Sequence, residues 1–141
     1  YAYSMKATEK SDVYSMGIVM MELVSGRMPT DSRFAEAMED MVKWVQRCVT
    51  SRSSSSSSGD GGGTSRSPGC EEVVDECLKP LSQHDLDSVF ELLDIAVECT
   101  RSNPSDRPAA RHVSDRLLHM SRRHRTTPNC TKRVSSSTDY D

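Results

Sequence analysis

The residues of this 141-residue chain that could carry chemistry are four histidines, five cysteines and a large number of carboxylates. Three of the histidines, His112, His119 and His124, fall close together, and the first two are seven residues apart, so they could share one helix face. A metal site would also need cysteine or carboxylate ligands at matching spacing, and none accompanies them. We therefore expect solvated histidines on a helix surface and no metal site.

The cysteines are odd in number, and no two of them form a C-x-x-C pair: Cys48, Cys70, Cys77, Cys99 and Cys130. This pattern favours reduced thiols in a cytosolic compartment over a disulfide framework or a zinc site. The polar stretch from Tyr1 to Lys10 lacks the apolar core of a secretory signal. The sequon at Asn129 would matter only in a secreted protein.

A glycine-rich run, Gly59-Asp60-Gly61-Gly62-Gly63-Thr64, has a superficial likeness to a phosphate-binding loop. Such a loop follows a strand, opens a helix and supplies a lysine, and none of these accompanies the run. Residues 50–69 hold nine serines and five glycines, a composition typical of a flexible linker. The carboxylates of residues 70–100 form no pair with an arguable catalytic placement, so we expect a solvated face.

The net charge of −3 conceals an acidic segment, residues 70–100 at −8, followed by a basic one, residues 101–134 at +7. The two segments either pair internally or form two different faces. The basic segment contains no aromatic residue, which argues against nucleic-acid binding. The longest apolar run, 16–24, is nine residues long and is interrupted by Glu22, too short to span a bilayer.

Hydrophobic periodicity predicts an all-α protein without repeats. Ser11 or Asp12 could cap a core helix over 12–25 that is apolar nearly all round, and Gly26 and Pro29 would end it. We further expect an amphipathic helix over 34–49 with Trp44 off its stripe. The remaining predicted elements are a short acidic helix or turn over 71–81, a buried helix over 85–100, a loop over 102–108, a helix over 109–120 and a disordered basic, serine-rich tail over 122–141.

Two patterns carry more specific information. The first is Thr8-x-Lys10-Ser11-Asp12-Val13-Tyr14-Ser15-x-Gly17, continued by Met21-Glu22-Leu23 and Gly26-x-x-Pro29; the second is Cys99-Thr100-x-x-x-Pro104-x-x-Arg107-Pro108. In this order and about ninety residues apart, they resemble the C-terminal lobe of plant receptor-like Ser/Thr protein kinases. The stretch 1–31 and the runs 41–45 and 78–81 look most like leucine-rich-repeat receptor kinases of the GASSHO type.

The resemblance implies a helical bundle, the distal part of an incomplete kinase fold. It covers residues 1–121 as a partial kinase domain with helices F to I, and makes 50–69 an insertion between helices G and H. Asp12 matches the aspartate at the start of the family's helix F, whose carboxylate accepts backbone N–H bonds from the catalytic loop. Gly17 matches a small residue that permits close packing of helix F. Arg107 matches the arginine that pairs with the glutamate of an Ala-Pro-Glu motif, which would precede Tyr1; without it, Arg107 would be a buried or half-buried cation lacking its carboxylate.

Phosphoryl transfer by kinases requires a glycine-rich loop, a strand lysine, a His-Arg-Asp loop and an Asp-Phe-Gly motif, and none occurs in these 141 residues. We therefore expect no catalytic, cofactor-binding or metal-binding residue here, with ATP and Mg bound by the parent kinase. The expected partners are the N-lobe and catalytic loop of that kinase and its protein substrates, on the cytoplasmic side of the plasma membrane. The alternative is a non-catalytic helical interaction module, cytosolic if expressed alone.

Overall fold

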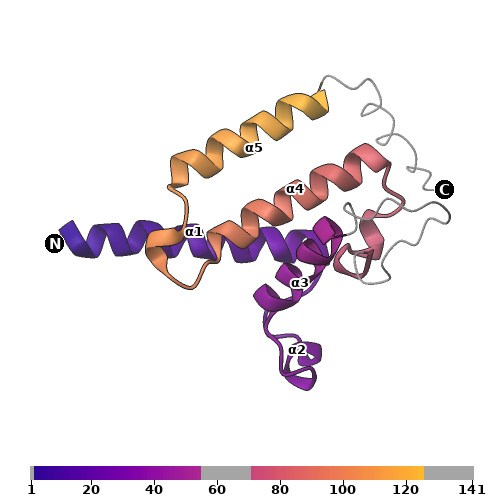
Figure 1. Cartoon of the computed structure of the whole chain (residues 1–141), viewed down its shortest axis with the longest axis horizontal. Coiled ribbons are helices and arrows are strands. Elements are labelled where there is room, and N and C mark those ends of the chain that lie inside the picture. Colours follow the sequence, from indigo (N-terminus) through magenta and orange to yellow (C-terminus); the bar gives the residue numbers. More distant parts are fainter. Residues whose placement is uncertain (1, 55–70, 126–141) are drawn as a thin grey trace, which may run out of the picture.

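The computed structural model describes residues 2–54 and 71–125, which form α-helices and short 3-10 helices (Figure 1). The α-helices are α1 (Ala2–Ser25), α2 (Ser32–Glu36), α3 (Met41–Ser54), α4 (Gln83–Cys99) and α5 (Ala110–Arg125). The 3-10 helices are η1 (Glu71–Val73), η2 (Glu76–Leu78) and η3 (Pro104–Asp106). No strand occurs in the described ranges, and the all-α prediction is confirmed.

Helix α1 is the element on which the others assemble. Its most extensive partner is α4, and α3, α5 and η3 also contact it. In Figure 1, α4 and α5 extend to one side of α1, whereas α2 lies on the other. The shared core contains these buried residues: Val13, Met20, Met21, Val24, Phe34, Met41, Val45, Cys48, Val73, Val74, Phe90, Leu93, Ile95, Ala96, Cys99, Val113 and Met120.

The first helix begins earlier than its sequence suggests. The prediction that it starts at residue 12 is wrong, because Ser11 and Asp12 lie inside α1 rather than at its cap. Residues 2–10 contain good helix formers and no Gly or Pro, so nothing in them ends the helix. The predicted end at Gly26 is confirmed: this glycine has a φ of 63° and its N–H donates to the Glu22 carbonyl at 2.8 Å.

The single helix predicted over 34–49 is wrong, because the chain breaks between α2 and α3. Met38 adopts a φ of 50° and its side chain is 93% exposed, although the periodicity placed it on the buried stripe. Asp40 then starts α3 by accepting the Lys43 N–H at 2.8 Å, as an N-cap residue does. The apolar spacing continued across the break, so periodicity could not show it.

The other elements lie close to their predicted positions. The acidic segment predicted over 71–81 is η1 and η2, the helix predicted over 85–100 is α4, and the loop predicted over 102–108 contains η3. Two flexible segments were predicted too long, since α3 extends through Ser54 into the 50–69 linker and α5 extends through Arg125 into the 122–141 tail. The remainder of both segments, including the run 59–64, lies outside the described residues.

The acidic and basic segments pair internally, which was one of the two interpretations of the charge pattern. Arg116 on α5 lies 2.6 Å from the Glu98 carboxylate on α4, and Arg123 pairs with Glu91 in the same way. Each pair is at least partly exposed, so each adds little to stability.

Candidate functional site

The exposed side of α1 is the first candidate surface. Asp12 is exposed there, and Met16, Val19 and Leu23 follow at the helical spacing i+4, i+7 and i+11. Their exposed fractions are 44%, 49% and 70%, so the prediction that α1 is buried nearly all round is wrong for this stripe. Within the described residues α1 is therefore two-sided: one side contributes to the core, and the other carries Asp12 and an apolar stripe.

Gly17 lies at the closest approach of α1 to α4. A Cβ atom built on Gly17 would lie 2.7 Å from the Thr100 methyl carbon and 2.9 Å from both the Ala96 carbonyl oxygen and the Cys99 Cβ. Real Cβ atoms essentially never approach so closely, and the carbonyl oxygen belongs to backbone that cannot turn aside. The packing role that the resemblance implies for this glycine is thus compatible with its surroundings.

Arg107 joins the loop after α4 to α1. Its guanidinium donates to three carbonyl oxygens: Nε to Arg101 at 2.8 Å, Nη1 to Lys10 at 3.0 Å and Nη2 to Ser102 at 3.4 Å. The guanidinium carbon also lies 4.7 Å from the centre of the Tyr14 ring. In return, the Lys10 ammonium donates to the Arg107 carbonyl at 2.5 Å.

Within the described residues, the acceptors of the Arg107 guanidinium are main-chain carbonyl groups. The residue is half-buried, which was one of the two expected degrees of burial, and its charge is not left without acceptors. Three carbonyl dipoles and an aromatic face stabilise the cation. The sequence did not indicate this arrangement, because the acceptors are main-chain atoms, which any residue type supplies.

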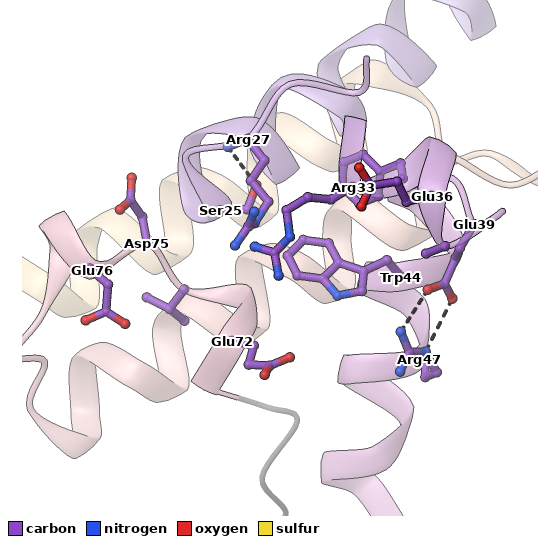
Figure 2. Close-up of a pocket in the computed structure, with 13 residues that line it drawn as sticks. Ser25, Arg27, Arg33, Glu36, Glu39, Trp44, Arg47, Glu72, Asp75 and Glu76 are labelled. Atoms are coloured by element: carbon purple, nitrogen blue, oxygen red, sulfur yellow. Dashed lines mark hydrogen bonds and ion pairs between the residues drawn. The ribbon is translucent and has the colours of Figure 1, made fainter. Parts of the chain in front are cut away.

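A cleft lies between α2, α3 and the η1–η2 segment, and Figure 2 shows it. This cleft, of about 690 Å³, is centred on Trp44 and is lined by Ser25, Arg27, Arg33, Phe34, Glu36, Ala37, Glu39, Trp44, Arg47, Glu72, Val74, Asp75 and Glu76. The centres of the Trp44 and Phe34 rings are 5.6 Å apart. The Arg27 guanidinium carbon lies 5.5 Å from the centre of the Trp44 ring. Sequence reasoning missed the cleft, and the only signal was that Trp44 falls off the buried stripe of its helix.

The other candidate residues form no site in the described ranges. His112 and His119 are exposed on α5, as predicted, and no group of His, Cys, Asp or Glu there could hold a metal ion. Cys48, Cys77 and Cys99 form no disulfide. Burial raises the pKa of the Cys99 thiol, which keeps it protonated and unreactive.

Comparison with known proteins decides the family. Over 120 residues, 85% of this chain, the sequence is 46% identical to the LRR receptor-like serine/threonine-protein kinase GSO1 of Arabidopsis thaliana and 42% identical to GSO2 of the same plant. The chain belongs to the plant leucine-rich-repeat receptor-like kinases. It spans only 8% of the length of these two relatives. No family model matches the chain.

A solved receptor-like kinase structure supports the fold. The pseudokinase domain of BIR2, an immune regulator of the RLK/Pelle family, matches with a TM-score of 0.62 at 22% identity. The match covers 90% of this chain and 33% of that domain. The helices of this receptor-like kinase chain therefore correspond to part of a kinase domain, as the sequence predicted. None of its described helices has the length and apolar character that a bilayer crossing requires.

Proposed function

We propose that this chain is the C-lobe scaffold of a receptor-like Ser/Thr kinase that transfers phosphate from ATP to proteins in signalling. The chain contributes none of the residues that hold ATP or Mg or that act in transfer; those belong to the preceding part of the kinase domain. That domain lies on the cytoplasmic side of the plasma membrane.

The observation that carries this proposal is the position of Asp12 on the uncovered side of α1. Asp12 is in line with Met16, Val19 and Leu23, three apolar side chains that are 44–70% exposed. Fully burying such a side chain contributes about 1.5–3 kcal/mol, so a covering segment would be stabilised by this stripe. The preceding part of the kinase domain is that segment, and its catalytic loop donates backbone N–H groups to the Asp12 carboxylate.

Arg107 has a positioning role in the same scaffold. Its half-buried guanidinium holds the η3 loop against α1 through the Lys10 carbonyl and the Tyr14 ring. The carboxylate of the Ala-Pro-Glu motif reaches Arg107 in the complete domain, where it competes with the weaker carbonyl acceptors.

The test uses the longest transcript that carries this sequence, expressed as a complete kinase domain. We expect an in-frame upstream segment with the missing motifs, and about a 10²-fold loss in kcat/KM for Asp12→Ala because the catalytic loop shifts. Asp115→Ala on the exposed side of α5 is the control and should leave activity unchanged. Equal activity of the two variants, or a transcript without the motifs, would reject the proposal.

The second candidate is a non-catalytic interaction module, and the exposed stripe of α1 favours it equally as a partner-binding face. The matched BIR2 structure is itself described as a pseudokinase domain and an immune regulator. An authentic translation start near Met5 would favour this candidate. Mapping the 5′ end of the transcript separates the two.

A further inference from the structure

The Trp44 cleft contains a pair of arginines whose positions the scaffold role does not explain. Arg27 enters from the connection between α1 and α2, and Arg33 enters from α2. Figure 2 shows both side chains directed into the cleft, with the guanidinium of Arg33 pointing toward Arg27. An anion in the cleft that reached both guanidiniums would be attracted by each of them.

One nitrogen of the Arg27 guanidinium lacks a hydrogen-bond partner. Its Nε is buried and has no hydrogen-bond partner, while its guanidinium carbon lies 5.5 Å from the centre of the Trp44 ring. A buried charged donor without an acceptor destabilises the fold, and buried polar groups are nearly always paired. An oxygen atom supplied by a ligand would complete this donor.

The third arginine of the cleft, Arg47, already has a carboxylate partner. It forms a bidentate ion pair with Glu39, with N–O distances of 2.8 and 3.3 Å. No such pair is made by the side chain of Arg27 or Arg33 within the described residues. Arg27 and Arg33 are therefore the donors that remain for a ligand.

We propose that this cleft binds an acidic peptide segment, whose Asp or Glu carboxylate lies between Arg27 and Arg33. A planar carboxylate matches the fork of a guanidinium and forms the stronger, charge-assisted kind of hydrogen bond. The half-buried Trp44 offers an aromatic surface for an apolar side chain next to the acidic residue. The inference does not depend on whether the lobe belongs to an active kinase.

The rim of the cleft selects a carboxylate over a phosphate. Five carboxylates line it: Glu36, Glu39, Glu72, Asp75 and Glu76. Since Glu39 pairs with Arg47, four carboxylates remain beside Arg27 and Arg33, so a ligand is held by direct contact with the two arginines and not by the overall charge of the cleft. The carboxylates repel any anion, and they repel a phosphate, with its charge near −2, more strongly than a singly charged carboxylate. The ligand is thus an acidic side chain flanked by apolar residues, not a polyanion.

The test exploits the fact that Trp44 is the only tryptophan in the chain. The full chain is titrated with a blocked Leu-Glu-Leu peptide, with its Leu-Gln-Leu counterpart and with a Leu-phosphoserine-Leu peptide, and tryptophan fluorescence is followed. We expect a saturable change with the Glu peptide that weakens as salt rises, and about tenfold weaker binding of the Gln peptide. Equal affinity of the Glu and Gln peptides would overturn the proposal, and so would tighter binding of the phosphoserine peptide.

Three variants locate the binding. Arg33→Gln, at an exposed position on α2, should weaken binding of the Glu peptide about tenfold while the circular dichroism spectrum stays unchanged. Arg27→Gln should do the same, and it also removes the unsatisfied donor. Arg111→Gln, at an exposed position on α5, is the matched control and should bind like the unmodified chain. An equal loss in Arg33→Gln and Arg111→Gln would show a general charge effect and reject the cleft.

Discussion

Among single residues, Gly17 and Arg107 contribute most to the packing on α1, and both contact main-chain atoms of another segment. Gly17 is required by a backbone oxygen of α4, and Arg107 is held by three carbonyl oxygens. Both residues fix how another segment lies on α1, and the Tyr14 ring adds one side-chain contact at Arg107. Substitutions at these sites should therefore affect stability before they affect any chemistry.

Gly17→Ala should destabilise the chain despite the better helix propensity of alanine. The new methyl group would overlap the Ala96 carbonyl oxygen and the Cys99 Cβ, which are 2.9 Å from its position, and overpacking of this kind costs about 1–3 kcal/mol. The higher helix propensity of alanine offsets about 1 kcal/mol of this cost. Urea unfolding should show a lower midpoint for Gly17→Ala, while Ser15→Ala on the exposed side of α1 should change it little. An unchanged midpoint for Gly17→Ala would mean that α1 and α4 are not in this close contact.

Asp94 makes stability depend on pH. Partial shielding from water raises the pKa of its carboxyl above the usual value of an aspartate, and the nearby charge of Glu98 raises it further. The unfolded chain therefore ionises Asp94 first as pH rises, so the fold loses stability between the unfolded and the folded pKa. Asp94→Asn should raise the unfolding midpoint at pH 7, and this advantage should vanish near pH 3. A gain that persists at pH 3 would point to a cause other than ionisation.

At the scale of elements, α1 and α4 differ in how completely they are covered. α4 packs against α1, α3 and α5, whereas α1 leaves the stripe of Met16, Val19 and Leu23 toward solvent. Stripes of this kind on a central helix indicate a docking face rather than a defect in the core. Polar substitutions in this stripe should therefore weaken association with a partner and leave the folding of the chain unchanged.

A double substitution, Val19→Lys with Leu23→Lys, should keep the unfolding midpoint close to that of the unmodified chain. Both side chains are about half or more exposed, and lysine is a good helix former. The same variant should bind less hydrophobic dye and self-associate less. Leu93→Ala is the contrasting variant, because Leu93 is fully buried and its truncation should cost about 2–5 kcal/mol. Equal destabilisation by the two variants would show that the stripe is part of the core.

At the scale of the whole molecule, the chain has a continuous core but spans only 8% of its two Arabidopsis relatives. A stable domain has a margin of only about 5–15 kcal/mol, and three uncovered apolar side chains represent a substantial part of it. We expect the isolated chain to be helical and prone to self-association, and to become more sharply cooperative when the rest of the kinase domain is present.

The isolated chain should neither bind Mg-ATP nor transfer phosphate. The glycine-rich loop, strand lysine, His-Arg-Asp loop and Asp-Phe-Gly motif are all absent from these 141 residues. Isothermal titration with Mg-ATP should give no heat of binding, and a complete kinase domain of the family serves as the positive control. Binding in the micromolar range would show a nucleotide site that the known kinase motifs do not describe.

The helical class, the end of α1 at Gly26 and the family were all predictable from the amino-acid sequence, whereas the charge pattern left internal pairing as one of two interpretations. These features depend on local spacing, on backbone preferences and on short motifs, all of which are readable along one chain. The break between α2 and α3, the open stripe of α1, the carbonyl acceptors of Arg107 and the Trp44 cleft were decided only by the tertiary structure. Burial and main-chain hydrogen bonding depend on which segments meet in space, and neither the apolar character of Met38 nor that of Leu23 shows whether another segment covers it.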